Sequence, residues 1–230
     1  MEYTFNSRIR HSETDEDGIL KLENFINYFQ DCSTFQSEDL GLGIDYFREQ
    51  NIAWVLNSWQ IEILKYPKAC DYITVGTFAY DFKSFLGYRN FFMKDDKGEF
   101  LCKAASIWVL IDLKTGKPQK PRVEDVEKYG KQDRLDMEYG SRKIAVPDGL
   151  KGLDEIEVKE HHLDTNHHVN NGQFIKMAAL CLDNKQRPMR LRAEYKKQAY
   201  LSDIIVPFTD GKVVDLRSVS GESYCIVEVQ

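Results

Sequence analysis

Near the start of the chain, apolar and polar positions alternate in a way that predicts a strand followed by a helix. Residues 2 to 10 have the pattern of a strand, and a polar turn follows at 12 to 18. Apolar side chains then recur every three or four positions, which predicts a helix with one buried face over about 22 to 38. The positions on this face are Leu22, Phe25, Ile26 and Phe29. Gly41 and Gly43 are expected to end the helix.

Four long runs rich in aromatic and branched residues come next, and they predict strands. They cover residues 53 to 64, 72 to 81, 86 to 95 and 100 to 112. The connection from Asp95 to Glu99 contains two aspartates and a glycine, which is the composition of a tight hairpin turn. Strands joined by short turns imply an antiparallel sheet. The expected unit is therefore one helix on one broad sheet.

The same order of elements begins again in the second half of the chain. A short polar helix is expected near 122 to 129, and the charged stretch from 130 to 151 has the composition of an inter-domain linker. The elements predicted after it are a strand at 153 to 160, a polar turn at 161 to 171, a helix marked by Phe174, Ile175, Ala178 and Leu182, and strands near 189 to 198, 203 to 209, 212 to 218 and 223 to 229.

The two halves also match residue by residue. At an offset of 149 (164 minus 15), the matching pairs are Asp15 with Asp164, Phe25 with Phe174, and Ile26 with Ile175. At an offset of 132 (203 minus 71), Gln60-Ile61-Glu62 matches Arg192-Ala193-Glu194, and Asp71 matches Asp203. The second copy is shorter between its helix and its first strand. Two units of this kind bury their exposed sheet edges most easily by pairing side by side.

The predicted fold is therefore an α+β tandem, or double hot-dog, in which each unit is a long helix wrapped by an antiparallel sheet and the two sheets are joined side by side. The expected units are residues 1–130 and 152–230, with 131–151 as the linker between them. An internal pair already supplies the partner that one unit needs, so both a monomer and a homodimer fit the sequence.

Composition narrows the class of protein. Hydrophobic residues make up 42% of the chain and prolines number six, as in ordinary folded proteins. The net charge of -6 argues against nucleic acid as a partner, because phosphate binding needs a basic surface. The five cysteines form no C-x-x-C pair, which favours reduced thiols. Neither an export signal nor a membrane span is expected, and the predicted location is the cytoplasm.

All but one of the five histidines lie in the turn before the second helix, at 161, 162, 167 and 168. One interpretation is structural, because the Asn and Asp residues among them are good turn and helix-cap residues. A second is a metal site, but adjacent histidines point in different directions and no cysteine pair or helical histidine spacing completes a ligand shell, so no metal is expected. The third is acid/base catalysis.

Catalysis would centre on His168, which is expected at the start of the second helix. The positive end of the helix dipole favours neutral imidazole, the form that accepts a proton. Free backbone amides at the same helix start could hold a carbonyl oxygen as negative charge develops on it. Asp164 and Asn166 would then orient the imidazole or a water molecule. The matching turn of the first unit has Ile19 in place of His168, which predicts one active site for the pair of units.

At these residues the sequence resembles the acyl-acyl-carrier-protein thioesterases, in particular bacterial relatives of the plant plastid enzymes. The matching segments are Leu163-Asp164-Thr165-Asn166-His167-His168-Val169-Asn170-Asn171 against the pattern L-D-x-N-x-H-V-N-N, and Trp54-Val55-Leu56, Gln60-Ile61-Glu62, Tyr66-Pro67, Ser106-Ile107-Trp108-Val109 and Glu194-Tyr195-Lys196-Lys197. The resemblance implies a double hot-dog fold and hydrolysis of the thioester between a fatty acyl chain and the phosphopantetheine of an acyl carrier protein. It implies catalytic roles for Asp164, Asn166 and His168.

The sequence departs from the family at one place. After Glu-Tyr and two basic residues, the plant pattern continues with an acid and a cysteine, whereas Gln198 and Ala199 stand here. Ala199 cannot be a nucleophile and Gln198 cannot take a proton, so covalent cysteine catalysis is excluded at that position. The general base must then be His168 or Asp164. The hypothesis is direct hydrolysis without a cofactor, in which His168 activates water, Asp164 and Asn166 position it, and Gln198 completes the polar cluster.

The first unit is expected to hold the acyl chain, and its aromatic side chains could line a tunnel or simply form the core. These are Phe25, Phe29, Phe35, Tyr46, Phe47, Trp54 and Trp59. An acidic carrier protein would need basic side chains near the tunnel mouth. The candidates are Lys83, Arg89, Arg190, Arg192, Lys196 and Lys197. Two alternatives stay open: an acyl-CoA thioesterase on the same fold, and a non-catalytic module that binds the acyl carrier.

Overall fold

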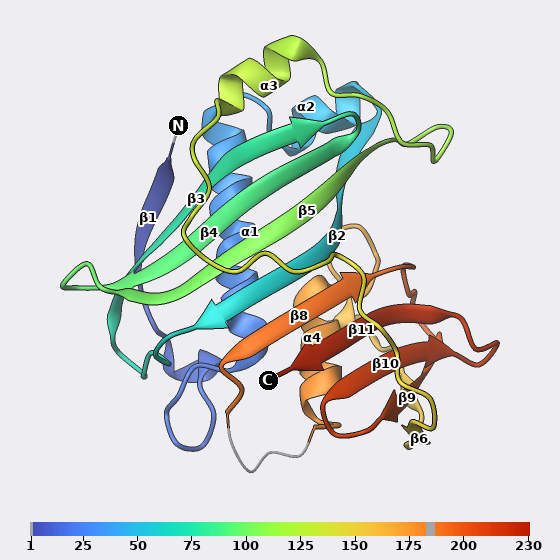
Figure 1. Cartoon of the computed structure of the whole chain (residues 1–230). Coiled ribbons are helices and arrows are strands. Elements are labelled where there is room, and N and C mark those ends of the chain that lie inside the picture. The colour runs from blue at the N-terminus through green and yellow to red at the C-terminus, as the bar shows by residue number, and fades with distance from the viewer. Residues whose placement is uncertain (1, 183–186) are drawn as a thin grey trace.

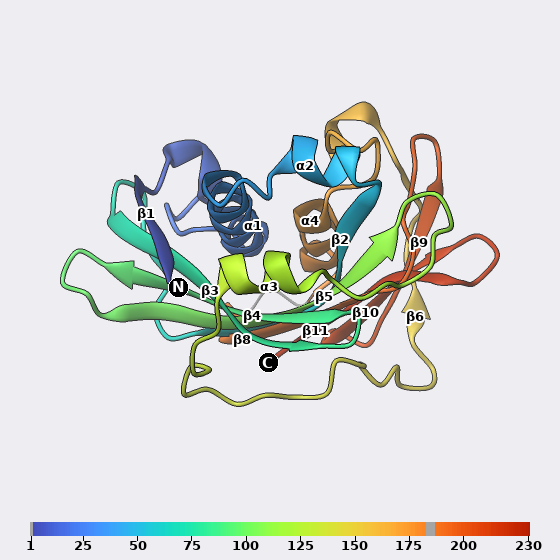
Figure 2. The same ribbon diagram turned by 90° about the horizontal axis from the view of Figure 1, so that it is seen from above.

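A computed structural model describes residues 2–182 and 187–230 as one continuous sheet with helices packed on one face (Figures 1 and 2). The elements of the first half are β1 (Tyr3–Arg8), α1 (Leu22–Asp39), α2 (Ile44–Glu49), β2 (Ile52–Ile63), β3 (Tyr72–Lys83), β4 (Leu86–Asp95), β5 (Phe100–Asp112) and α3 (Val123–Tyr129). Those of the second half are β6 (Lys151–Gly152), β7 (Ile156–Glu157), α4 (Asn171–Ala179), β8 (Arg190–Tyr195), β9 (Ile204–Thr209), β10 (Val213–Ser218) and β11 (Ser223–Val229).

The two halves join edge to edge through β2 and β8, which run antiparallel. Ser58 pairs with Glu194, and Gln60 pairs with Arg192. The strand order is β1-β3-β4-β5-β2-β8-β11-β10-β9-β6, with β7 also paired to β9. Every strand therefore belongs to one antiparallel sheet whose centre is the joint between the halves. This confirms the predicted double hot-dog fold.

Helices α1 and α4 bury the faces that the sequence patterns predict. Phe25, Ile26 and Phe29 of α1 are fully buried, as is Ile175 of α4, and all belong to one apolar cluster under the sheet. The ring of Phe29 packs 5.8 Å from that of Trp59 on β2. Burial of each such side chain contributes about 1.5–3 kcal/mol, so these helical faces hold the two helices on the sheet.

Three elements differ from the sequence prediction. α2 was not expected, because six residues give too little periodicity to recognise. α4 ends at Ala179, so Leu182 lies beyond the helix although it still packs on the core. The strand predicted at 153 to 160 is wrong as a continuous element. Leu153 donates its amide to the carbonyl of Pro207 on β9 (2.9 Å), but Pro207 has no N–H to donate in return, and the ladder is interrupted there.

The segment between α3 and β6 crosses the face of the sheet opposite to α1 and α4, as Figure 2 shows. Side chains at the joint of the two halves bind its backbone. Gln60 donates to the carbonyl of Glu138 and accepts the amide of Gly140 (2.8 Å), while Glu194 accepts the amide of Ile144 (2.9 Å). Side chains of Gln60-Ile61-Glu62 on β2 and Arg192-Ala193-Glu194 on β8 thus satisfy backbone polar groups of this crossing segment. No helix in residues 2–182 and 187–230 is long and apolar enough to span a membrane.

Candidate active site

The histidine-rich turn is closed by Asp164. One carboxylate oxygen of Asp164 accepts the backbone amides of Asn166 (2.8 Å) and His168 (3.3 Å). The amide of Asp164 in turn donates to the carbonyl of His168 (2.8 Å). These three hydrogen bonds fix the backbone of the turn, and they place Asn166 and His168 on one loop of five residues.

The turn before α1 has the same geometry without a histidine. Asp15 accepts the amides of Asp17 and Ile19, both at 3.0 Å, and its own amide donates to the carbonyl of Ile19 (2.8 Å). The contacts of Asp164 are therefore those that build the turn in either half. The difference lies in the side chains: His167, with φ of 60°, stands where the first turn has Gly18, with φ of 73°.

His168 precedes the helix rather than starting it, because α4 begins at Asn171 and Asn170 is its N-cap. The side chain of Asn170 accepts the amide of Gly172 (2.8 Å), and its carbonyl accepts the amide of Gln173 (2.9 Å). Two of the helix-start amides that the sequence suggested as an oxyanion site, those of Gly172 and Gln173, are thus engaged by Asn170. These two amides are not available to a carbonyl oxygen, which increases the importance of side-chain donors near the turn.

The side chain of Tyr200 lies beside His168 and contacts Gln198. The imidazole of His168 meets the ring of Tyr200 edge to face, with 5.0 Å between the ring centroids and an interplanar angle of 86°. The hydroxyl of Tyr200 donates to Oε1 of Gln198 (3.2 Å). Gln198 is therefore linked to His168 through Tyr200. Within the described residues, no hydrogen bond joins the imidazole to the carboxylate of Asp164, so a direct orienting contact expected from the sequence is not observed.

Sequence analysis missed Tyr200. The repeat matches Tyr200 with Lys68, but which residue lies opposite each is visible only in the structure. The amide of Tyr200 donates to the carboxylate of Asp203 (2.9 Å), as the amide of Lys68 does to Asp71 (2.8 Å) at the matching place in the first half. Lys68 pairs with Ile19 in an isolated bridge. Because Ile19 matches His168, the partner of Ile19 points to the partner of His168.

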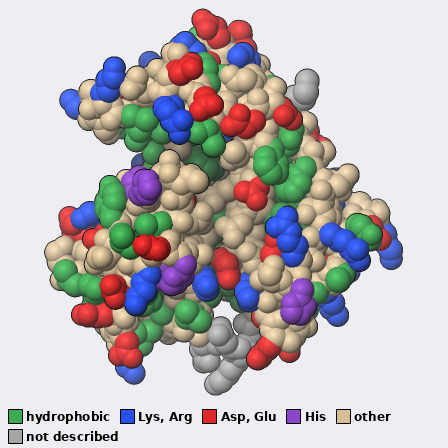
Figure 3. All heavy atoms as spheres, turned by 180° about the vertical axis from the view of Figure 1, so that it is seen from behind, with side chains coloured by type: hydrophobic (Ala, Val, Ile, Leu, Met, Phe, Trp, Pro, Cys, Tyr) green, Lys and Arg blue, Asp and Glu red, His purple; other side chains and the backbone are tan. Residues whose placement is uncertain are grey.

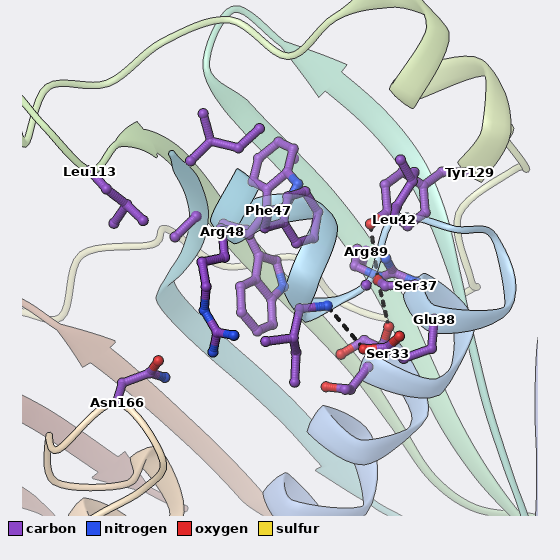
Figure 4. Close-up of a pocket in the computed structure, with 18 of the residues that line it drawn as sticks. Ser33, Ser37, Glu38, Leu42, Phe47, Arg48, Arg89, Leu113, Tyr129 and Asn166 are labelled. Carbon is purple, nitrogen blue, oxygen red and sulfur yellow. Dashed lines mark hydrogen bonds between the residues drawn. The ribbon is translucent and has the colours of Figure 1, made fainter. Parts of the chain in front are cut away.

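A cavity of about 420 Å³ opens in the first half and reaches this turn (Figure 4). Its walls include the apolar side chains Phe47, Trp54, Phe82 and Trp108. Thr165 and Asn166 are the lining residues that come from the second half. Figure 3 shows the molecule from the side opposite to Figure 1, where a hollow opens beside a histidine side chain and charged side chains of both signs are interspersed.

The aromatic residues of the first half divide between cavity and core. Phe47 and Trp54 line the cavity, whereas Phe25, Phe29 and Trp59 are buried in the core cluster. The remaining candidates do not line the cavity: the side chain of Phe35 is 43% exposed, and that of Tyr46 packs on Phe47. The sequence pattern could not separate these groups, because both need apolar side chains.

Arg89 is a lining residue of the cavity and is 8% exposed. It donates to Oε1 of Gln36 and to Oγ1 of Thr77 (3.4 Å), and its guanidinium lies 5.3 Å from the ring centre of Tyr129. Burial lowers the pKa of this guanidinium. Arg89 cannot be a surface contact for a carrier protein, which corrects one candidate from the sequence.

Most of the other basic candidates are engaged by carboxylates of the same chain. The pairs are Lys83 with Asp81, Arg190 with Glu62 and Glu138, Arg192 with Glu228, and Lys197 with Glu222. An acidic partner would have to compete with these carboxylates. The stretch from 190 to 197 is therefore a weaker carrier-binding surface than its sequence indicates.

The first turn, which corresponds to the histidine-rich turn of the second half, is bound by an arginine side chain. Arg187 donates to Asp15 (2.8 Å) and Asp17 (2.6 Å), across the mouth of the first turn. Burial raises the pKa of Asp15, but the hydrogen bonds from Arg187 and from two backbone amides outweigh it, so the pKa is lowered overall. With Ile19 in place of a histidine, this turn has no base.

Neither a thiol nor a metal ligand set lies at the active turn. Cys32, Cys102 and Cys225 are fully buried, and burial raises the pKa of the Cys32 thiol to about 12. Within residues 2–182 and 187–230, no group of three His, Cys, Asp or Glu side chains is placed to hold a metal ion. Ala199 is fully buried at the position where the plant pattern has a cysteine.

Comparisons with known proteins identify the family and the fold. Residues 1–129 match the family model for the acyl-ACP thioesterase N-terminal domain. The chain is 25% identical over 217 residues to the chloroplast acyl-acyl-carrier-protein hydrolase FATB3 of Cuphea viscosissima, covering 87% of this chain and 53% of that protein. It is also 25% identical over 223 residues to the chloroplast palmitoyl-acyl carrier protein thioesterase of Arabidopsis thaliana, covering 89% and 54%. The chain thus spans about half the length of these curated relatives.

Solved structures share the whole fold. An acyl-ACP thioesterase from Bacteroides thetaiotaomicron superposes with a TM-score of 0.89 at 24% identity, covering 99% of this chain and 96% of that one. The 12:0-ACP thioesterase from Umbellularia californica superposes with a TM-score of 0.84 at 15% identity, covering 100% and 96%. At these identities the likeness establishes the arrangement of both halves.

Proposed function

The chain belongs to the acyl-ACP thioesterase family, and from this premise we propose that it hydrolyses the thioester between a fatty acyl chain and the phosphopantetheine arm of an acyl carrier protein. The observation that carries the proposal is the position of the active turn. Thr165 and Asn166, on the turn that bears His168, line a cavity whose other walls come from the first half. An acyl chain in that cavity would have its thioester at the turn.

In the proposed reaction, His168 takes a proton from a water molecule, and the water oxygen bonds to the thioester carbonyl carbon. The tetrahedral intermediate then collapses with cleavage of the C–S bond. The imidazolium returns its proton to the leaving thiolate, so the products are a free fatty acid and the thiol of the carrier. His168 is the base in this scheme, and Asp164 holds the turn through the two backbone amides that its Oδ1 accepts.

Asn166 is an exposed side chain at the cavity rim, and we assign it to the carbonyl oxygen or the attacking water. Gln198 is the second polar side chain assigned to this cluster. In this proposal residues 1–130 hold the acyl chain and residues 152–230 supply the catalytic groups. One chain supplies both parts, so the reaction needs no second copy.

Acyl-CoA is the second candidate substrate, and one observation supports it. The carboxylate partners of Arg190, Arg192 and Lys197 weaken the case for a carrier-binding surface along β8. An acyl-CoA thioesterase would use the same cavity and the same turn.

The test uses purified chain with matched acyl-carrier-protein and acyl-CoA substrates from about C4 to C18, a range that brackets plausible cavity depths, read as released fatty acid at moderate salt. Faster turnover of the carrier-bound acyl chain supports the proposal. Faster turnover of acyl-CoA at every length identifies the second candidate. Binding of acyl carrier without release above background would show a non-catalytic module.

A further inference from the structure

Tyr200 stands where this chain departs from its family, directly after Gln198 and Ala199. Its ring is in edge-to-face contact with the imidazole of His168, at 5.0 Å between centroids. The first half has Lys68 and Ile19 at the two matching places, and they form a plain backbone bridge. The aromatic contact therefore belongs to the half that carries the histidine.

Hydrogen bonds fix the backbone next to both residues of this contact. The amide of Val169, next to His168, donates to the carbonyl of Ala199 (2.9 Å), next to Tyr200. The amide of Tyr200 donates to the carboxylate of Asp203 (2.9 Å). Because these bonds repeat those at the first turn, they belong to the scaffold. The Tyr200 ring is 49% exposed, so it is not required to fill the core.

The phenol also fixes one end of Gln198. Tyr200 donates its hydroxyl proton to Oε1 of Gln198 (3.2 Å). A carboxamide has one oxygen acceptor and one NH₂ donor group, on opposite branches. With the oxygen turned to the phenol, the NH₂ of Gln198 is left for other partners, and it can only donate.

We propose that Tyr200 is a positioning residue of the proposed thioesterase reaction: its ring holds the imidazole of His168, and its hydroxyl turns the carboxamide of Gln198 so that the NH₂ donates to the thioester oxygen. This inference rests on the proposed function. Gln198 thereby adds a donor beside a helix start at which Asn170 already accepts the amide of Gly172, and the oxygen of Gln198 accepts the hydroxyl of Tyr200.

The test separates the hydroxyl from the ring and tests whether it acts through Gln198. Tyr200→Phe keeps the ring and removes the hydroxyl. The loss of one hydrogen bond worth about 0.5–1.5 kcal/mol is expected to lower kcat roughly twofold to tenfold with KM little changed. In a Gln198→Ala background the same substitution is expected to cost nothing more, because the residue through which the hydroxyl acts is gone. Tyr200→Leu, which also removes the ring, is expected to lower kcat further.

Tyr72→Phe is the matched control and should leave kcat unchanged, since Tyr72 is an exposed tyrosine on β3, in the half that lacks His168. Wild-type kcat in Tyr200→Phe, or losses from Tyr200→Phe and Gln198→Ala that simply add, would overturn the inference. Loss of activity in His168→Ala would then still support the proposed function. Activity retained in His168→Ala would overturn the role of His168 and leave Tyr200 no base to position, whereas a wild-type chain that releases no fatty acid would overturn the proposed function.

Discussion

Asp164 repeats the hydrogen bonds of Asp15 in the other half of the molecule. Each carboxylate accepts the amides two and four residues further along the chain, and each amide donates to the carbonyl four residues further along. Only one of the two turns has a histidine. The shared contacts therefore account for the shape of the turn, and the chemistry has to come from the side chains that differ.

Replacing Asp164 by Asn is expected to preserve the turn, because the amide oxygen still accepts both backbone amides. Replacing it by Ala removes both bonds and is expected to cost about 1–3 kcal/mol, which lowers Tm by several degrees in a chain of this size. Thermal unfolding of the two variants measures the difference. Asp15→Asn and Asp15→Ala are the matched pair in the first turn. Equal stability of Asp164→Asn and Asp164→Ala would contradict this role.

Gly87 offers a way to narrow the proposed acyl cavity by one methyl group. A Cβ at Gly87 would lie 3.1 Å from the ring of Trp54, so the ring has to move by a few tenths of an ångström. Gly87→Ala is expected to reduce turnover of the longest accepted acyl chains more than that of short ones. Released fatty acid over the chain-length panel measures this. Gly152→Ala is the control, because Gly152 lies on an exposed strand away from the cavity, and it should leave the chain-length profile unchanged. An unchanged profile in Gly87→Ala would show that this cavity does not hold the acyl chain.

Arg187 links the pH dependence of stability to the first turn. The pKa of Asp15 is lowered in the folded chain, so the pair stabilises the fold above the unfolded pKa of about 3.8 and loses this contribution as pH falls below it. Arg187→Gln should therefore lower Tm at pH 7, and the difference from wild type should shrink toward pH 3. Arg48→Gln, which removes an exposed pair with Asp45, is the control. A difference that persists unchanged at pH 3 would show that Arg187 acts by another contact.

The sequence predicted the fold through repeated local patterns, and it failed where long-range geometry decides. Phe25 and Phe174 mark helical faces at one offset, and the structure buries both. The burial of Arg89 depends on contacts with Gln36 of α1 and Tyr129 of α3, which periodicity does not reveal. The contact of Tyr200 with His168 depends on a backbone bond between Val169 and Ala199, thirty residues apart. Composition likewise could not show that the basic residues of β8 have carboxylate partners.

Turnover of acyl carrier protein substrate by His168→Ala, beside His167→Gly, tests the central claim most directly. His167 has a positive φ and stands where the first turn has glycine, so His167→Gly keeps the backbone and is expected to retain activity within roughly threefold. His168→Ala is expected to lower kcat roughly 100- to 10,000-fold with Tm close to that of wild type. Release of fatty acid by folded His168→Ala at the wild-type rate would contradict the account.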